Sequence, residues 1–259
     1  MKVVLFCGGF GTRLREHSET IPKPLVNIGY RPVLWHLMRY YAHYGHKDFV
    51  LCLGYRGDLI KRFFLDFEEE MSNDFVLHGD GRRTELLASD IDDWRITFVD
   101  TGLHSNIGER LLAVRRFVKD EDSFLANYAD GLSDLPLDRY VSEAVASDAV
   151  ATILAARSAQ SLHAVRTRPD GVVTSITRMD ELDLRINAGF FVLKQEIFNY
   201  IEPGEELVER PFERLIASGR LRAYRYDGFW GPMDTLKDKI SYDRRHARGD
   251  APWEVWNQR

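Results

Sequence analysis

The chain has 259 residues, and its 35 Lys and Arg against 40 Asp and Glu give a formal net charge of −5. This acidic balance excludes a strongly basic nucleic-acid-binding protein, while 44% hydrophobic and 29% charged residues exclude a disordered chain. Two cysteines are too few for a disulfide framework, and no apolar run reaches the roughly 18 residues that cross a membrane, so we predict a cytoplasmic protein with no nucleic-acid or membrane partner.

Short apolar runs alternate with helical patterns in the first half of the chain. Residues 3–6 and 48–53 are apolar runs that predict buried strands. Residues 32–44 and 58–67 have apolar side chains at helical spacing, and Gly45 suits the end of the first helix. This order of strand, helix, strand and helix predicts a parallel sheet with helices on its faces.

The rest of the chain continues the alternation, with one interruption. Residues 71–87 lack the rhythm and contain Gly79-Asp80-Gly81, which predicts a hairpin or an excursion from the domain. We find no internal repeat, low-complexity tract or linker, so the sequence predicts one α/β domain with a mixed sheet in its second half. Strands are expected at residues 94–99, 123–128, 149–156, 172–176, 188–193 and 221–226, and helices at 109–118, 138–147 and 237–249.

A glycine-rich turn follows the first predicted strand. Gly8-Gly9-Phe10-Gly11-Thr12-Arg13 places small residues where backbone N–H groups can approach phosphate oxygens, and Arg13 can add a bidentate contact. The dinucleotide-binding pattern fails because Leu14 stands where its last glycine belongs, and the chain has no Gly-Lys pair for a P-loop. The turn therefore indicates either a phosphate loop of another kind or a simple tight connection between strand and helix.

One lysine lies between two prolines shortly after this turn. In Pro22-Lys23-Pro24 the proline rings restrict the backbone, so Lys23 projects from a defined extended segment. A lysine held near a glycine-rich phosphate loop can offset the negative charge that develops during phosphoryl chemistry. The simpler alternative is an exposed lysine in a turn.

These motifs are part of a larger pattern that covers nearly the whole chain. GGFGTRL followed by PKPLVNIGYRPVLWH resembles the signature of the sugar-phosphate nucleotidyltransferases. Within that family, WGPMDTLKDK and the final APWEVW are most similar to the glucose-1-phosphate cytidylyltransferases. Further similar segments are LCLGYRGDLIKRFF, WRITFVDTG, NYADG and NAGFFVL.

The resemblance implies a fold, a domain organisation and a reaction. The fold would be a Rossmann-like α/β nucleotidyltransferase fold with a central mixed, mostly parallel sheet, built by residues 1–259 as a single domain. About residues 1–135 would bind the nucleotide, and about residues 136–259 would bind the sugar phosphate. The implied enzyme transfers a nucleoside monophosphate, with CMP from CTP as the leading choice, to a sugar 1-phosphate or a related phosphate and releases pyrophosphate. The resemblance also implies a homo-oligomer, with residues 71–94 as an assembly excursion.

The resemblance further assigns roles to individual residues. Arg13, Lys23 and Asp130 would be catalytic, with Arg13 facing the pyrophosphate and Lys23 near the α-phosphate. Asp130 and Asp234 would hold Mg²⁺, which is bound by one or two carboxylates together with phosphate oxygens and water. Taken alone, each aspartate is better explained as a turn or helix-cap residue. The implied nucleotide-binding residues are Gly8, Gly9, Gly11, Thr12, Arg13, Thr101, Gly102 and Arg110.

Two stretches depart from the family pattern. Glu109 stands before Arg110, beside the implied base site, where the cytidylyltransferase branch commonly has a second glycine. In the acceptor half, Thr177-Arg178-Met179 replaces a Glu-Lys-Pro motif, so Arg178 takes the place of the phosphate-binding lysine and the sugar-binding glutamate is missing. Arg178 and Asn187 are then the implied substrate-binding residues, and the missing glutamate indicates a different sugar or a non-sugar phosphate.

Three functions remain open from the sequence. The leading one is a CTP-dependent sugar-1-phosphate nucleotidyltransferase. The second is the same reaction with GTP, dTTP or UTP. The third is a nucleotide-binding or sugar-phosphate-binding homologue without turnover, which the altered residues 177–179 favour and the retained Arg13, Lys23, Asp130 and Asp234 disfavour.

Overall fold

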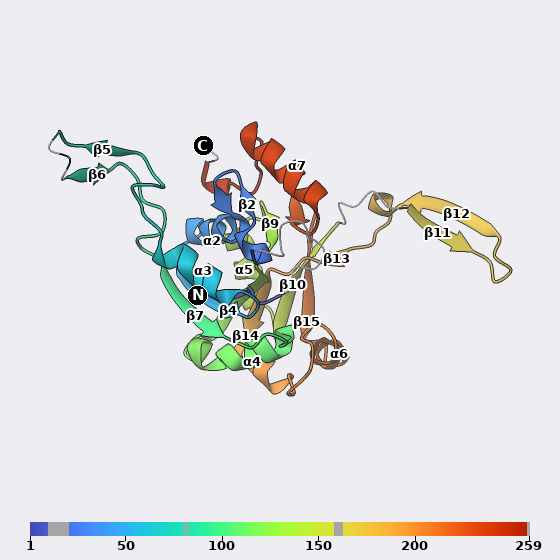
Figure 1. Ribbon diagram of the computed structural model, residues 1–259. Helices are drawn as coiled ribbons and strands as arrows, with labels where there is room; N and C mark the ends of the chain where they lie inside the picture. Colours follow the sequence, from blue (N-terminus) through green and yellow to red (C-terminus); the bar gives the residue numbers. More distant parts are fainter. Residues whose placement is uncertain (10–20, 80, 82, 158–162, 258–259) are drawn as a thin grey trace.

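The centre of the molecule is an eight-stranded sheet with helices on both faces (Figure 1). It is seen in a computed structural model that describes residues 1–9, 21–79, 81, 83–157 and 163–257. In their order across the sheet, the strands are β13 (Ile186–Asn187), β10 (Ala151–Ala156), β14 (Phe191–Lys194), β8 (Ser123–Tyr128), β1 (Val3–Phe6), β4 (Asp48–Leu53) and β7 (Arg95–Asp100), and β15 (Leu221–Tyr226) also pairs with β10.

The pairing of the strands divides the sheet into two parts. On the β7 side, β4 pairs in parallel with β1 and β7, and β1 pairs in parallel with β8. On the other side, β14 runs antiparallel to both β8 and β10, while β15 runs parallel to β10. The expected α/β fold with a mixed, mostly parallel sheet is therefore confirmed, and so is the mixed character of the second half.

Alternation along β1 shows why helices cover both faces. Val3 and Leu5 belong to one buried cluster, whereas Val4 and Phe6 belong to another, because successive side chains of a strand point to opposite faces. Helix residues of each face complete the two clusters. The first face is covered by α2 (Val33–His43), α3 (Gly57–Leu65), α5 (Leu137–Ala146) and α7 (Leu236–Ala247), and the second by α4 (Ile107–Val118) and α6 (Arg210–Ala217) (Figure 1).

The second half of the chain departs from the predicted elements in two ways. The strand expected at residues 188–193 begins only at Phe191, because Gly189 and Phe190 have φ of +73° and +48° and turn the chain between β13 and β14. Helix α6 was not predicted, although its buried Phe212 and Leu215 lie at helical spacing. Several very short strands carried no readable pattern, since two or three residues define no periodicity. These strands form two ribbons. One pairs β2 (Asn27–Ile28) with β3 (Arg31–Pro32), and the other pairs β9 (Gly131–Ser133) with β16 (Trp230–Pro232). The short 3₁₀ helices are η2 (Lys23–Leu25), η3 (Met179–Glu181), η4 (Gln195–Asn199) and η5 (Val255–Asn257).

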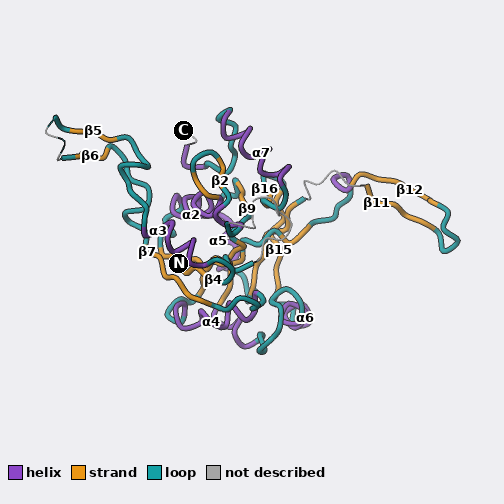
Figure 2. The backbone as a smooth tube through the Cα atoms, viewed as in Figure 1, coloured by secondary structure: helices purple, strands orange, loops and turns teal. Residues whose placement is uncertain are grey.

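Two hairpins project from the body on opposite sides (Figures 1 and 2). The first pairs β5 (Phe75–Leu77) with β6 (Thr84–Leu86), which confirms the excursion predicted for residues 71–87. The second pairs β11 (His163–Thr167) with β12 (Val173–Arg178). Within the described ranges, no helix combines the length and the apolar character that a membrane crossing requires.

Candidate active site

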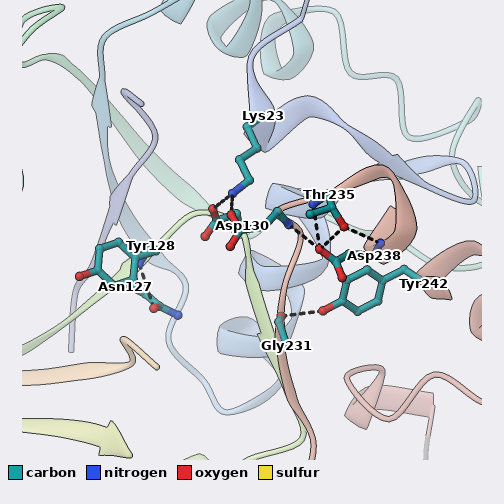
Figure 3. Close-up of polar contacts among 9 residues, drawn as sticks. Lys23, Asn127, Tyr128, Asp130, Gly231, Thr235, Asp238 and Tyr242 are labelled. Carbon is teal, nitrogen blue, oxygen red and sulfur yellow. Dashed lines mark hydrogen bonds and ion pairs between the residues drawn. The ribbon is translucent and has the colours of Figure 1, made fainter. Parts of the chain in front are cut away.

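A short 3₁₀ turn positions Lys23 in front of the sheet. Pro22 is extended, with φ of −67° and ψ of 146°, and its carbonyl accepts a hydrogen bond from the Leu25 N–H at 2.8 Å. Pro24 lies in the first turn of η2, where its missing N–H costs nothing. The sequence predicted that Lys23 projects from an extended segment, but only Pro22 is extended and Lys23 begins the 3₁₀ helix. The Lys23 side chain points toward Asp130 (Figure 3).

The ribbon of β9 and β16 brings together two aspartates that are far apart in the sequence. Asp130 directly precedes β9 and Asp234 follows β16, and Gly131 pairs with Pro232 in the antiparallel register. The Met233 N–H donates to the Asp130 carbonyl at 2.8 Å, which closes the ribbon at this end. Both carboxylates accept hydrogen bonds from the Lys23 ammonium, that of Asp234 at 2.5 Å.

The electrostatics of this cluster keep its lysine charged. Burial alone lowers the pKa of Lys23, but the nearby carboxylates of Asp130 and Asp234 raise it above its usual value. The side chains of the three residues are 14%, 24% and 26% exposed, so they remain open to a bound ligand. One ammonium facing two carboxylates leaves a net negative charge, which suits a further cation.

The same two carboxylates fit a divalent metal ion. Among the described residues, no group of three or more His, Cys, Asp or Glu could hold a metal by itself. Asp130 and Asp234 converge from two different loops and supply the hard oxygen ligands that such an ion prefers. This donor set matches an ion that completes its coordination with phosphate oxygens and water.

A cavity of about 410 Å³ opens beside this cluster. It gathers several of the residues singled out in the sequence, although they come from five separate segments. Its wall includes Gly8, Gly9, Lys23, Arg110, Asp130 and Asp234. Gly11, Thr12 and Arg13 lie outside the described residues, so their predicted phosphate contacts remain predictions.

Arg110 joins the ends of three parallel strands at the back of the cavity. Its guanidinium donates to the Leu53 carbonyl at 3.1 Å, to Thr101 Oγ1 at 2.7 Å and to the Gly8 carbonyl at 3.1 Å. A Cβ on Gly8 would lie 2.1 Å from Arg110 Nη1, so glycine is required for this approach. Thr101 is buried, and its contribution is to accept the hydrogen bond from Arg110. Gly102 follows it with a φ of +96°. Contact of these residues with a base stays a prediction.

The departure at Glu109 has a structural cause. Asn106 caps α4, and its Oδ1 accepts from the Glu109 N–H at 2.9 Å, while the Glu109 carboxylate accepts from the Asn106 N–H at 2.9 Å. This reciprocal capping box stabilises the start of the helix. At Gly108 a Cβ would lie 2.1 Å from the Glu205 carbonyl, so the first glycine of the pair is required for packing and the second is not.

Glu206 is a member of the cavity wall that the sequence did not reveal. Its Oε2 accepts from the Ile107 N–H at 3.2 Å, which places it at the start of α4. Its Oε1 is buried and has no hydrogen-bond partner among the described residues. No motif surrounds this glutamate, because only the folded chain brings residues 106 and 206 together.

The two predicted acceptor residues lie outside this wall. Arg178 ends β12 of the projecting hairpin, opposite His163. Asn187 lies in β13 beside Ala155 of β10, and its Oδ1 accepts a hydrogen bond from the Gly189 N–H at 3.1 Å. Its side chain lies near Tyr128, which lines the cavity. The described structure therefore connects Asn187 with the cavity through one residue, whereas Arg178 lies on a separate arm.

Comparison with known proteins gives a consistent picture. The model of the nucleotidyl transferase family matches residues 2–230. The glucose-1-phosphate cytidylyltransferase of Salmonella typhimurium (strain LT2) is 38% identical over 258 residues, which cover 99% of this chain and 100% of that protein. The probable glucose-1-phosphate cytidylyltransferase of Bacillus subtilis (strain 168) is 36% identical over the same shares.

Solved structures share the fold at low sequence identity. HddC from Yersinia pseudotuberculosis superposes with a TM-score of 0.67 at 19% identity and covers 95% of this chain and 99% of its own. A putative glucose-1-phosphate thymidylyltransferase from Bacillus anthracis, solved in complex with sucrose, gives 0.66 at 15% identity and covers 94% of each chain. These two similarities concern the fold alone.

Proposed function

The chain belongs to the nucleotidyl transferase family, and from this premise we propose that it transfers CMP from CTP to a sugar 1-phosphate and releases pyrophosphate. The full-length similarity to glucose-1-phosphate cytidylyltransferases supports CTP as the donor and glucose 1-phosphate as the first acceptor to test. The observation that carries the proposal is the Lys23 ammonium between Asp130 and Asp234 at the edge of a glycine-lined cavity.

The proposed reaction is a direct in-line displacement. An oxygen of the sugar phosphate attacks the α-phosphorus of CTP, the bond from that phosphorus to the oxygen bridging the β-phosphorus breaks, and pyrophosphate leaves with the electron pair. No covalent enzyme intermediate is needed, so positioning and charge neutralisation supply the catalysis. Lys23, held by its prolines and charged through its raised pKa, would offset the charge that grows on the phosphate oxygens.

Nucleotidyltransferases of this family generally use a divalent metal, and Mg²⁺ is our proposed ion for this chain. Asp130 and Asp234 would hold it. A bound Mg²⁺ supplies Lewis-acid polarisation and charge neutralisation at the phosphates. The protein's own task is to present both carboxylates from the ribbon of β9 and β16 at a fixed separation.

The nucleoside would occupy the end of the cavity near α4. Arg110 donates to the Gly8 carbonyl there, and Glu206 lines the same cavity. A carboxylate can accept a hydrogen bond from a cytosine amino group or a ribose hydroxyl. This arrangement supports residues 1–135 as the main nucleotide-binding part, with Glu206 and Asp234 reaching in from the second half.

The acceptor would bind through residues of about 136–259. Arg178 can hold a phosphate bidentately, and Asn187 would face sugar hydroxyls beside Tyr128. Because Arg178 lies on the projecting hairpin, its contact with the acceptor requires that the hairpin and the cavity meet in the working enzyme, within one chain or between copies.

A homo-oligomer is the assembly we propose. Both projecting hairpins expose apolar side chains, among them Leu77 at 60% and Ile176 at 65% exposure. Exposed apolar arms of this kind commonly mark interaction sites. Light scattering coupled to gel filtration is expected to give a multiple of the 30.0 kDa chain mass, and a monomer would contradict this part of the proposal.

The function is tested by a pyrophosphate-release assay. The protein is incubated with Mg²⁺, each of CTP, UTP, dTTP and GTP in turn, and a panel of sugar 1-phosphates and phosphonates. We expect the fastest release with CTP and a hexose 1-phosphate. Faster release with another triphosphate would reassign the nucleotide, and no release with any pair would favour a binding protein without turnover.

A further inference from the structure

The backbone makes an unusual turn directly after Asn187. Gly189 and Phe190 both lie in the left-handed region, with φ of +73° and +48°. Glycine adopts this conformation freely, whereas a residue as bulky as phenylalanine does so only at a cost in free energy. Such strain persists only where the surrounding structure holds it, and it is found mostly at functional sites. The residues that hold this turn are therefore candidates for a functional role.

Asn127 holds the turn from strand β8, three residues before Asp130. It is 0% exposed, and its Oδ1 accepts hydrogen bonds from the N–H groups of Tyr128 and Phe190, each at 2.9 Å. Figure 3 shows the first of these bonds. A Cβ on Gly189 would lie 2.4 Å from the same oxygen, so only glycine allows this approach. A single buried oxygen thus ties the turn to the end of β8.

Two further side chains hold the carbonyl groups of the turn. Trp230 Nε1 donates to the Ala188 carbonyl at 3.0 Å, and the Tyr140 hydroxyl donates to the Phe190 carbonyl at 2.5 Å. Trp230 begins β16, the strand that leads to Asp234. The turn is therefore held by both segments that carry a carboxylate of the catalytic cluster.

The turn also places the implied sugar-binding residue against the cavity wall. The Asn187 side chain is exposed, and its Oδ1 accepts from the Gly189 N–H at 3.1 Å. Gly189 packs on the ring of Tyr128, since a Cβ there would lie 2.9 Å from Tyr128 Cδ2. Tyr128 lines the catalytic cavity. The conformation of the turn therefore sets where Asn187 lies relative to the cavity.

We propose that Asn127 is a positioning residue for the sugar phosphate, which acts by holding the turn that carries Asn187 and itself contacts no substrate. The inference rests on the proposed function, because the sugar-binding role of Asn187 belongs to that function. The competing explanation is that the turn only packs the Phe190 ring against the rings of Tyr40 and Tyr41. Loss of Asn127 would then lower stability without a selective loss of sugar-phosphate binding.

The first test is the kinetics of Asn127→Leu in the pyrophosphate assay. This variant loses the oxygen that accepts both hydrogen bonds, so we expect the KM for glucose 1-phosphate to rise about tenfold and the KM for CTP to stay unchanged. Asn127→Asp keeps an oxygen that can accept both bonds and should bring the KM for glucose 1-phosphate back to within about threefold of the normal value.

A double variant tests whether Asn127 acts through Asn187. Once Asn187→Ala has removed the side chain that the turn positions, Asn127→Leu should raise the KM for glucose 1-phosphate by no more than about a further twofold. Gln195→Leu is the matched control, because this amide donates to the Val118 carbonyl at the other end of β14. It should lower the free energy of unfolding and leave both KM values unchanged.

Equilibrium binding separates this inference from the transfer reaction. Glucose 1-phosphate is titrated by calorimetry into the protein with Mg²⁺ and α,β-methylene-CTP, which permits no transfer. We expect its Kd to rise about tenfold in Asn127→Leu. If that variant does not fold, Trp230→Phe, which removes the bond to the Ala188 carbonyl, should raise the Kd about threefold.

The inference is overturned if Asn127→Leu binds glucose 1-phosphate as tightly as the unaltered protein does, or loses affinity for the nucleotide equally. Selective weakening of glucose 1-phosphate binding in a protein that releases no pyrophosphate would contradict the proposed function and support the positioning role. Absence of glucose 1-phosphate binding by the unaltered protein would contradict both.

Discussion

The phosphate end and the acceptor end of the proposed reaction are built in different ways. At the phosphate end, Lys23, Asp130 and Asp234 meet through the main sheet and one short ribbon, so these three side chains come together within a single chain. At the acceptor end, Asn187 reaches the cavity through Tyr128, and Arg178 lies on a projecting hairpin. In this proposal the main sheet and one ribbon position the phosphate chemistry, whereas an acceptor contact by Arg178 depends on a projecting hairpin.

The largest effect is expected at the ion-paired centre. Lys23→Ala and Asp130→Ala should each lower kcat at least about 100-fold. The first removes a positive charge that offsets the charge on the phosphate oxygens, and the second removes a carboxylate that holds Lys23 and would hold the metal ion. Steady-state pyrophosphate release measures this. Lys47→Ala is the matched control, since Lys47 is an exposed, ion-paired lysine far from the cavity, and it should keep the normal rate. Near-normal activity of either site variant would refute the assignment.

A smaller effect is expected behind the phosphate loop. Arg110→Lys cannot serve the Leu53, Thr101 and Gly8 acceptors together, so we expect the KM for CTP to rise about tenfold and the free energy of unfolding to fall by about 2 kcal/mol. Nucleotide titrations and urea unfolding give the two values. Arg115→Lys on the outer side of the same helix should change neither, and equal behaviour of the two variants would refute the positioning role of Arg110.

A substitution at the acceptor end should have a smaller effect, and only on the KM for the sugar phosphate. Arg178→Ala is expected to raise the KM for the sugar phosphate about fivefold and to leave the KM for CTP unchanged, because a lost phosphate contact affects ground-state binding. Arg166→Ala, on the partner strand of the same hairpin, serves as control. An unchanged acceptor KM in Arg178→Ala would remove this residue from the site and leave the hairpin to assembly.

The smallest expected effect is on pH dependence. The pKa of Lys23 is raised in the folded protein, so its stabilising contribution is fully present below the ordinary lysine pKa and is lost as the pH rises through the folded value. The difference in unfolding free energy between the unaltered protein and Lys23→Met should thus be constant from pH 7 to about 10. A difference that declines already near pH 8 would show that the two aspartates do not hold the lysine charged.

The sequence predicted several elements in the first half of the chain well, because the residues that determine each of them are neighbours in the sequence. The apolar run at residues 3–6 and the helix ending before Gly45 are each set by neighbours in the chain, and the structure confirms the strand and the helix that they predict. The pairing of Asp130 with Asp234 followed from family resemblance alone, since it depends on a ribbon of three-residue strands.

Other features could not be predicted because they exist only between distant segments. Glu206 meets the start of α4 through a tertiary contact between residues about a hundred positions apart in the sequence. The capping role of Glu109 was readable in the sequence, because a glutamate three residues after Asn106 is the pattern of a capping box. The family pattern, by contrast, marks position 109 only as a missing glycine.

The central claim is that the cavity beside Lys23, Asp130 and Asp234 performs nucleotidyl transfer. Phosphorus NMR of the protein with Mg²⁺, CTP and glucose 1-phosphate tests it most directly. The account predicts that pyrophosphate and a CDP-sugar appear in equal amounts as CTP and the sugar phosphate disappear, and that neither product forms with Asp234→Ala. Release of CMP without a CDP-sugar, or equal product formation by Asp234→Ala, would contradict the claim.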